Sequence, residues 1–329
     1  MTEGIASIPD TTRAGPTVSV VIATYNYAKY LRECLKSVFE QTFSDYEIIV
    51  VDDGSTDETP HVLESITDPK LKKLRIQNQC ISAARNVGLD QASGEFVAFL
   101  DADDRWLPRK LERQVLLLRS EALVGLVFSD FVRFNETEYL PNAFSFFPEI
   151  RSFPSRPSAD GGGRVVVGDA FEVLLRFQFF PTFAQVTMFR RSLLGDLRFP
   201  TQLRMSEDLY FLMRLYERTE VAIIDDPLAE VRRHGKNISH SHLEQRLWDL
   251  KALRILEADA APEHRKEVRA RLAVAHAGTG YHFFWRRQPL KAARHYFSAM
   301  AYPGKRFNAL VHLAALPISV FLPPRQTIE

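Results

Sequence analysis

The sequence predicts an α/β protein in which helices flank a mostly parallel β-sheet, with a helical region appended at the C-terminus. Three observations lead to this fold class. Short runs rich in β-branched residues lack polar alternation, which is typical of parallel strands covered on both faces. Segments with apolar residues at helical spacing separate these runs, and this alternation indicates βαβ units. Beyond His242 almost every segment has the pattern of a helix.

The first predicted units show this alternation most clearly. Residues 17–23 (TVSVVIA) and 46–51 (YEIIVV) are predicted buried strands. Between them, apolar side chains recur at helical spacing as far as Gln41, which predicts an amphipathic helix. After the second strand, Ser55 and Glu58 have the spacing of a capping box, and Pro60 suits the first turn of the following helix.

The later elements follow the same rule until the chain reaches residue 135. We expect strands at 71–77, 95–100, 123–128 and 185–189, and helices at 82–91, 108–119 and 169–176. Residues 135–168 carry several prolines and three consecutive glycines, so we expect a long loop or a partly ordered insertion there. Residues 270–285 and 290–300, separated by Gln288 and Pro289, predict a helical hairpin.

The composition argues against several partners. Lys plus Arg (42) nearly equals Asp plus Glu (41), so we expect no nucleic-acid partner. Cys34 and Cys80 lie far apart without metal-ligand spacing, which favours a cytoplasmic location. No run of eighteen apolar residues predicts a membrane span. The C-terminal segment either packs on its own protein or makes a peripheral contact, through residues 305–325, with the inner face of the membrane.

Polar residues follow three of the predicted strands. The first strand runs into residues 23–26, the second into 52–55, and the fourth into 101–104. In open parallel sheets, ligands bind beyond the carboxyl ends of the strands. The three polar clusters therefore predict a single site at one edge of the sheet.

Two of these clusters allow more than one interpretation. Asp101 and Asp103 can turn toward one side and hold a divalent cation, magnesium or manganese, that keeps positions free for substrate phosphates. They can instead form a polar turn that caps the helix near Pro108. Asp53 and Gly54 suit a strand-to-helix turn, although a carboxylate there can also bind the base or ribose of a nucleotide.

Three stretches taken together resemble the family 2 glycosyltransferases: VSVVIATYNYAKYLRECLKSVFEQTFSDYEIIVVDDGSTDET, ISAARNVGL and GEFVAFLDADD. The resemblance is dense over residues 17–130 and looser to about residue 240. It implies a GT-A-type, Rossmann-like fold of the bacterial enzymes and an inverting transfer from a nucleotide-sugar donor. A UDP-sugar and a Mg or Mn ion are the donor and cofactor that the resemblance favours.

The resemblance also implies roles for residues at the donor side. Asp53 matches the residue that reads the nucleotide base, with Ala23 and Thr24 beside it, and Arg85 matches a donor-side position. One departure is Cys80, where the family commonly has glycine two residues before the serine. A side chain there can narrow the loop beside the nucleotide and so affect donor preference.

The acidic motif and a later loop are the expected metal site. Asp101, Asp103 and Asp104 match the motif that binds the donor ribose and the metal, Asp103 serving both. His234 lies in a segment similar to one that approaches the donor diphosphate in the family, and neutral imidazole is a competent metal ligand. Five further histidines in the loops and tail show no ligand spacing with one another and are expected to be structural: His240, His242, His264, His276 and His282.

Asp208 is the expected general base. By itself, the acidic pair Glu207–Asp208 before an amphipathic run predicts only a favourable first turn of a helix. The resemblance instead implies that Asp208 removes the proton of the acceptor hydroxyl while that oxygen attacks the anomeric carbon.

These expectations divide the chain and define its function. Residues 1–15 are a disordered lead-in, 16–130 the nucleotide-sugar-binding half, 131–240 the acceptor-side half, and 241–329 the helical region. We expect sugar transfer to a glycan or lipid-linked glycan in polysaccharide or cell-surface glycan synthesis. The alternatives are a sugar-nucleotide nucleotidyltransferase, which would usually have a glycine-rich loop after the first strand, and a non-catalytic binding domain.

Overall fold

The computed structural model describes residues 15–176, 183–234 and 242–302. Its strands are β1 (Val18–Thr24), β2 (Tyr46–Asp52), β3 (Leu71–Arg75), β4 (Phe96–Phe99), β5 (Arg105–Trp106), β6 (Val124–Phe134), β7 (Tyr139–Leu140), β8 (Ser155–Pro157), β9 (Arg164–Val166), β10 (Thr187–Arg190) and β11 (Glu220–Arg232). Its α-helices are α1 (Ala28–Phe39), α2 (Thr59–Glu64), α3 (Ile81–Gln91), α4 (Lys110–Ser120), α5 (Ala170–Arg176), α6 (Glu207–Tyr216), α7 (His242–Asp259), α8 (Arg265–Trp285) and α9 (Pro289–Met300). The expected lead-in and the expected membrane contact through 305–325 fall almost entirely outside the described residues.

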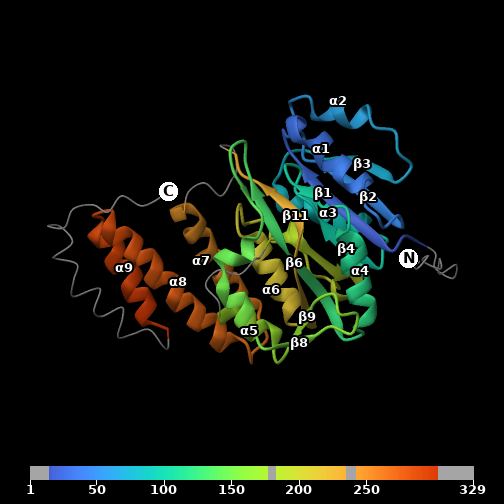
Figure 1. Cartoon of the computed structure of the whole chain (residues 1–329). Helices are drawn as coiled ribbons and strands as arrows, with labels where there is room; N and C mark the ends of the chain where they lie inside the picture. Colours follow the sequence, from blue (N-terminus) through green and yellow to red (C-terminus); the bar gives the residue numbers. More distant parts are fainter. Residues whose placement is uncertain (1–14, 177–182, 235–241, 303–329) are drawn as a thin grey trace.

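One mixed sheet organises the fold (Figure 1). Its order is β3-β2-β1-β4-β10-β6-β11-β9-β8, with β5 beside β11 and β7 beside β6. The strands β1 to β4 are parallel to one another, and β11 is parallel to β6. The α/β fold class, with a mostly parallel sheet flanked by helices and followed by C-terminal helices, is therefore confirmed.

The N-terminal half of the sheet is buried as the β-branched sequence predicts. Val20, Ile22 and Val50 have no exposed surface, because helices cover the strands. Helix α3 packs on β1 and β2. It approaches so closely at Gly88 that a Cβ there would lie 2.3 Å from Cγ1 of Val21, so a larger residue would push helix and strand apart.

The second half of the sheet differs from the expectation in two places. Strand β11 was not predicted, although it pairs with β6 along its length and with β5 and β9. The expected loop at 135–168 contains β7, β8, β9 and two short 3-10 helices, Ala143–Phe146 and Pro148–Ser152. Strand β9 joins the sheet by pairing with β11, so the two differences meet there, whereas β7 pairs with β6.

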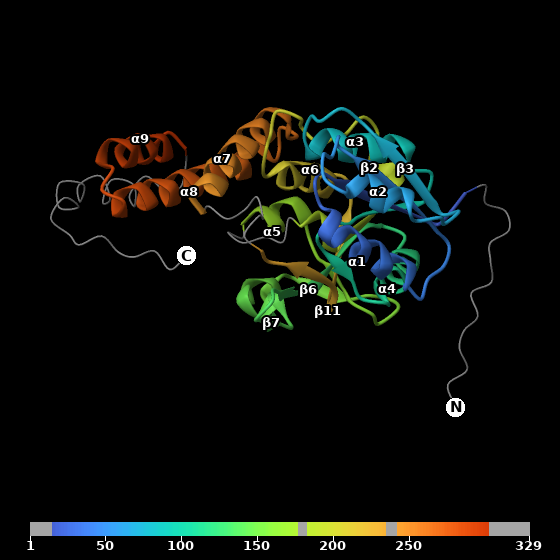
Figure 2. The same ribbon diagram turned by 90° about the horizontal axis from the view of Figure 1, so that it is seen from above.

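The described part of the C-terminal region, residues 242–302, is helical as expected. Helices α8 and α9 form the predicted hairpin, and α7 packs against both α8 and α6. Seen from above, the hairpin lies at the opposite end of the molecule from α1 and α2 (Figure 2). Among the described residues, no helix has the length and apolar character needed to cross a membrane.

Candidate active site

The polar ends of β1, β2 and β4 meet at one edge of the sheet. Thr24 at the end of β1 is in register with Asp52 at the end of β2, and the backbone N–H of Asp53 donates to the carbonyl oxygen of Thr24 at 2.9 Å. Directly after β4, the N–H of Leu100 donates to Val21 of β1 at 3.0 Å. The clusters at 23–26, 52–55 and 101–104 are therefore neighbours.

The turn after β1 is braced against the turn after β2. Asn26 has a φ of 59°, and its Oδ1 accepts from the backbone N–H of Thr56 at 2.8 Å. In return, Oγ of Ser55 accepts from the N–H of Asn26 at 2.9 Å. Ser55 is thus engaged elsewhere, and the predicted capping box is wrong: α2 begins at Thr59 after Glu58, without a side-chain cap.

Asp53 holds the loop that leads into α3. Its carboxylate Oδ1 accepts from the N–H of Gln79 at 2.9 Å, and its carbonyl oxygen accepts from Nδ2 of Asn78 at 3.1 Å. Burial raises the pKa of Asp53 above its ordinary value. Gly54 has a φ of 76°, and a Cβ there would lie 2.9 Å from the backbone nitrogen of Asn78. The close approach of the two loops therefore requires glycine.

The buried hydroxyl of Thr24 has an unusual environment. Thr24 is 3% exposed, and its Oγ1 has no hydrogen-bond partner in the described part of the chain. Buried hydroxyls normally find a partner. Ala23, which precedes it, is partly buried at the same strand end.

A buried ion-pair chain connects the loop after β4 with the start of α6. Nη2 of Arg85 lies 2.7 Å from Oδ1 of Asp101, and Nη1 lies 2.7 Å from Oε1 of Glu207. The Arg85 side chain is only 4% exposed. Burial lowers the pKa of Arg85, but Asp101 and Glu207 outweigh that effect and raise it above its ordinary value. The guanidinium of Arg85 is thus engaged by two carboxylates, and Glu207, expected only to favour the first turn of a helix, is part of the site.

Asp103 lies against His234. Oδ2 of Asp103 is 2.9 Å from Nε2 of His234, and the ring of Tyr30 stacks on the imidazole with centroids 5.0 Å apart. Burial and then the nearby carboxylate of Asp101 raise the pKa of Asp103. The two residues are 131 positions apart in the sequence, and β11, which ends just before His234, brings them together.

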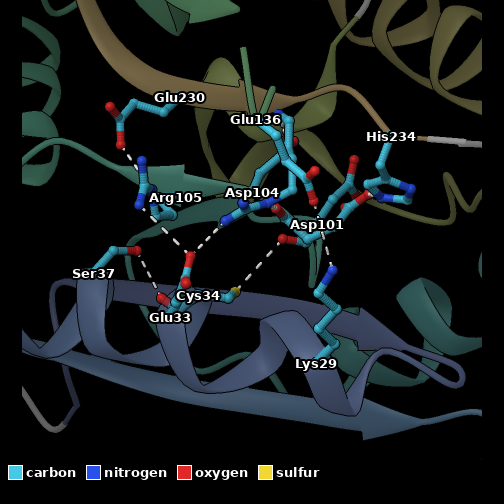
Figure 3. A network of polar contacts seen from close by, with 12 residues as sticks. Lys29, Glu33, Cys34, Ser37, Asp101, Asp104, Arg105, Glu136, Glu230 and His234 are labelled. Atoms are coloured by element: carbon cyan, nitrogen blue, oxygen red, sulfur yellow. Dashed lines mark hydrogen bonds and ion pairs between the residues drawn. The ribbon is translucent and has the colours of Figure 1, made fainter. Parts of the chain in front are cut away.

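Asp104 ties the acidic loop to β11. Its Oδ1 accepts from the backbone N–H of Arg232 at 2.8 Å, and Nε of Arg232 donates to the carbonyl oxygen of Asp103 at 2.9 Å. Burial, then Asp103 and Asp101, raise the pKa of Asp104 well above its ordinary value. Figure 3 shows this loop facing Glu33 and Cys34 of α1, and Glu33 forms an ion pair with Arg232 at 2.5 Å. The geometry favours Asp104 as a residue that positions the loop.

The acidic loop fits a metal ion only if the substrate completes the site. In the described ranges, no group of three or more His, Cys, Asp or Glu side chains could hold a metal ion. The 2.9 Å between Oδ2 of Asp103 and Nε2 of His234 is a hydrogen-bond distance. It also matches the separation of about 3 Å between adjacent ligands of an octahedral ion with bonds of about 2.1 Å. Magnesium commonly binds one or two protein ligands and takes the rest from phosphates and water.

Asp208 lies at the start of α6, beside Glu207. Its Oδ1 accepts from the N–H of Leu209 at 2.8 Å, so Oδ2 is available for a proton. Burial and then Glu207 raise the pKa of Asp208 well above its ordinary value. Ser206, just before the helix, has a φ of 62° and donates its hydroxyl to Asp249 of α7 at 2.7 Å. The turn that carries Asp208 is therefore held by the helical region.

Comparisons with known proteins find matches among glycosyltransferases. Residues 19–177 match the model of glycosyl transferase family 2. A putative glycosyltransferase from Bacillus subtilis, EpsH, is 28% identical over 77% of this chain and 73% of its own length. An uncharacterized glycosyltransferase from Nostoc sp. is 45% identical over 33% of this chain and 35% of its own length. The poly(ribitol-phosphate) beta-N-acetylglucosaminyltransferase TarS of Staphylococcus aureus is 28% identical over 78% of this chain and 44% of TarS, so the chain spans less than half of this relative.

Solved structures share the fold. The structure of S. aureus TarS 1-349 in complex with UDP-GlcNAc has a TM-score of 0.67 and 24% identity, over 93% of this chain and 86% of that one. The mannosyltransferase PcManGT from Pyrobaculum calidifontis, in complex with GDP-Man and Mn2+, has a TM-score of 0.57 and 22% identity, over 94% of this chain and 82% of that one.

Proposed function

Because the chain belongs to glycosyl transferase family 2 through the segment 19–177, we propose that it transfers a sugar from a nucleoside-diphosphate sugar to an acceptor hydroxyl, with inversion at the anomeric carbon. The observation that carries the proposal is the buried chain from Asp101 through Arg85 to Glu207. It joins the acidic loop, where a diphosphate would lie, to the helix start that carries Asp208. The proposed donor side and the proposed proton acceptor are thereby connected through the two ion pairs of Arg85.

The nucleoside of the donor is assigned to the ends of β1 and β2. The unpartnered hydroxyl of Thr24 and the carboxylate of Asp53 supply hydrogen-bonding groups there, beside Ala23. A UDP-sugar is the proposed donor, because the TarS structure with the same fold contains UDP-GlcNAc. Cys80, half-buried at the start of α3, borders this region and is placed to influence which donor fits.

Asp103 and His234 are proposed to hold a magnesium or manganese ion together with the donor diphosphate. When bound, the ion neutralises the charge of the departing diphosphate, so that no protein acid is needed for the leaving group. Asp101 and Asp104 flank this position, and Asp104 also holds the loop in place through Arg232. Arg85 supports the site by fixing Asp101.

Asp208 is the proposed general base. Its raised pKa suits this role, since a base works best when its pKa approaches the operating pH. The oxygen not engaged by Leu209 takes the acceptor proton as the acceptor attacks. The acceptor is proposed to be a glycan or lipid-linked glycan, and the protein is proposed to work in the cytoplasm, where Cys34 and Cys80 stay as free thiols.

A donor-turnover assay tests the proposal. The chain is incubated with UDP-GlcNAc, UDP-glucose or GDP-mannose in Mn²⁺, Mg²⁺ or EDTA, and release of the nucleoside diphosphate is followed. We expect turnover of one donor that EDTA abolishes and that Asp103→Ala removes. Asp90→Ala, at an exposed carboxylate paired with Arg198, is the matched control and should be fully active.

Two other results would identify the alternatives. Release of pyrophosphate from a nucleoside triphosphate and a sugar phosphate would establish a nucleotidyltransferase. Donor binding without turnover of any donor or acceptor would indicate a binding domain. The stereochemistry is read from the first sugar released: an α-linked donor should yield the β-anomer before mutarotation, and an α-anomer would rule out inversion.

A further inference from the structure

A cavity in the helical region, far along the chain from the acidic loop, carries an excess of positive charge. Its volume is about 560 Å³, and residues of α7, α8 and α9 line it. Six basic side chains contribute to its wall: Lys251, Arg254, His276, Lys291, Arg294 and His295. Glu244 is the one acidic residue of the lining. Three helices thus direct cations toward one space.

The four permanent cations of this wall have no anionic partner among the residues that the structure describes. Within the described residues, neither Lys251, Arg254, Lys291 nor Arg294 forms an ion pair. The contacts they do make are with rings: Nζ of Lys251 lies 3.6 Å from the ring centroid of Trp248, and Nζ of Lys291 lies 5.5 Å from that of Phe283. Their charge is therefore available to a bound anion.

The histidines lie deeper in the same wall. His276 is 3% exposed, its Nδ1 is 3.1 Å from Nδ1 of His295, and its Nε2 is 3.5 Å from Nη2 of Arg254. Burial, then His295 and Arg254, lower the pKa of His276 to about 4. Both observations describe a place where positive charge is crowded and an anion would relieve the repulsion.

A second cavity shows that arginines lining a cavity in this protein can be paired with carboxylates. About 430 Å³ of space lies beside β8 and β9, and arginines also line it. There, however, Arg113 pairs with Asp226 at 3.0 Å and Arg164 with Asp225 at 2.8 Å. The arginines Arg113 and Arg164 of that cavity are paired with carboxylates, whereas the lysines and arginines around the α7–α9 cavity form no ion pair in the described part of the chain.

We propose that the α7–α9 cavity binds a phosphate ester, that is, one or two phosphate groups carried on an organic moiety. Arginine suits phosphate because its planar guanidinium can donate two parallel hydrogen bonds. The space exceeds that of a phosphate group alone, and the apolar surfaces of Trp248, Leu250 and Phe283 can receive the organic part. A recessed wall with a buried histidine fits an inserted group better than a flat membrane surface. The inference does not depend on which donor the acidic loop takes.

Calorimetry on the full chain tests this assignment. Glucose 1-phosphate and inorganic pyrophosphate are titrated in EDTA, without nucleotide sugar, so that the acidic loop has no cation to recruit phosphate. We expect saturable binding of at least one probe. The double variant Arg254→Gln, Arg294→Gln should weaken it by about tenfold or more, since charge-assisted hydrogen bonds are lost.

A matched variant separates a local site from general electrostatics. Lys266→Gln with Arg286→Gln removes the same charge from exposed positions on and after α8 that do not line the cavity. It should bind the probes like the wild type, and equal weakening in both double variants would overturn the proposal. Donor turnover and the melting temperature should stay unchanged in both, because these side chains are exposed and none of them is a hydrogen-bond or ion-pair partner of Asp103 or Asp208.

A vesicle-binding experiment tests whether the basic side chains face a membrane instead. Sedimentation with vesicles of phosphatidylcholine and phosphatidylglycerol is compared with the calorimetry. Binding to vesicles that depends on Arg254 and Arg294, without binding of either soluble phosphate, would replace the proposed cavity site with a membrane-facing surface. Absence of binding to both soluble probes likewise contradicts the proposal.

Discussion

Arg85 is the residue on which the geometry of the site depends most. Its guanidinium is buried between Asp101 and Glu207, with both contacts at 2.7 Å, and it lies 5.3 Å from the ring centroid of Phe199. Removing one partner of a buried ion pair leaves an uncompensated charge, which is far more costly than losing an exposed pair. Here a single substitution would leave the buried carboxylate of Glu207 and the partly exposed carboxylate of Asp101 without their partner.

Arg85→Ala should therefore destabilise the protein strongly. We expect the free energy of unfolding to fall by roughly 3–5 kcal/mol. We also expect donor turnover to be lost. Arg198→Ala is the matched control, because Arg198 pairs with Asp90 on the surface, and exposed pairs contribute about 0–1 kcal/mol. Urea denaturation of the two variants measures the difference, and equal losses would show that the Arg85 contacts carry no special weight.

Asp208→Asn should separate catalysis from stability. The amide can still accept from Leu209 N–H and suits a helix start as well as aspartate does, so the melting temperature should hardly change. It cannot take a proton, so turnover should fall by about 10²–10⁴-fold while UDP binding persists. If donor hydrolysis is equally fast in wild type and variant, Asp208 is not the base.

Asp130 should make stability depend on pH. It is fully buried, its Oδ1 accepts from the N–H groups of Phe131 and Phe144, and its Oδ2 has no partner within the described residues. Burial raises its pKa to about 6. Since an unfolded aspartate has a pKa of about 3.9, the folded state binds the proton more tightly, and stability is lost as the pH rises from about 4 to about 6.

Asp130→Asn should remove that contribution. The melting temperature of the variant should fall less between pH 4 and pH 7 than that of the wild type, because no buried carboxyl loses its proton. Asp160→Asn, at an exposed position, should follow the wild-type profile. Parallel pH profiles for Asp130→Asn and the wild type would show that this carboxyl titrates normally.

At the scale of elements, α7 holds the turn that begins α6. Oγ of Ser206 donates to Oδ1 of Asp249 at 2.7 Å and accepts from Nε2 of Gln245 at 2.8 Å. Ser206 has a φ of 62°, which costs energy in a residue other than glycine and persists only when its surroundings enforce it. The helical region therefore takes part in the geometry of Asp208.

Asp249→Ala should lower kcat more than it raises the KM for the donor. Losing the anchor lets the first turn of α6 shift, and small displacements of a catalytic group have large effects on rate. We expect a fall in kcat of about tenfold or more. Glu257→Ala is the control on the same helix, because Glu257 pairs with Arg269 of α8, and its kcat should match the wild type. A rise in KM alone would place Asp249 in donor binding instead.

The elements that the sequence predicted are those with unbroken patterns. Strands β1 and β2 are mostly apolar runs, β4 is wholly apolar, and the α8–α9 hairpin has a clear break at Pro289. Strand β11 was missed because Asp225, Asp226 and Pro227 interrupt it, and its pairing with β6 shifts register at Pro227. The apolar run at residues 221–224 was the available signal.

The site was less predictable than the fold for a physical reason. The strand ends could be grouped because parallel strands share an edge. Contacts such as Arg85 with Glu207, which are 122 residues apart, depend on tertiary packing that no local pattern encodes. The roles proposed for Asp53, Asp103, Asp208 and His234 remain predictions for the assays above.

At the scale of the whole molecule, one sheet runs from β3 to β8 and passes through both expected halves of the chain. The acidic loop belongs to the first half. Arg232, at the end of β11, and His234, just after it, belong to the second half and contact this loop. The proposed donor site therefore requires both parts of the fold to be in place. Binding at such a site should stabilise the molecule as a unit.

UDP with Mn²⁺ should raise the melting temperature in a single transition. A ligand at 100 times its Kd stabilises the folded state by about 2.7 kcal/mol. Asp53→Ala should reduce the shift by weakening nucleotide binding, whereas Asp90→Ala should leave it intact. Differential scanning calorimetry with and without UDP makes the comparison, and an undiminished shift in Asp53→Ala would restrict Asp53 to a role in its turn.

The two cysteines differ in a way that gives experimental access to the molecule. Cys34 has no exposed surface, and burial raises the pKa of its thiol, so it should resist alkylation in the folded state. Cys80 is partly exposed, precedes α3 and adjoins the loop held by Asp53. Because the chain has only these two cysteines, a maleimide fluorophore should attach at one position without any engineering. The emission of that fluorophore should then change when a nucleotide binds. Nucleotide binding could therefore be followed in real time on the natural sequence.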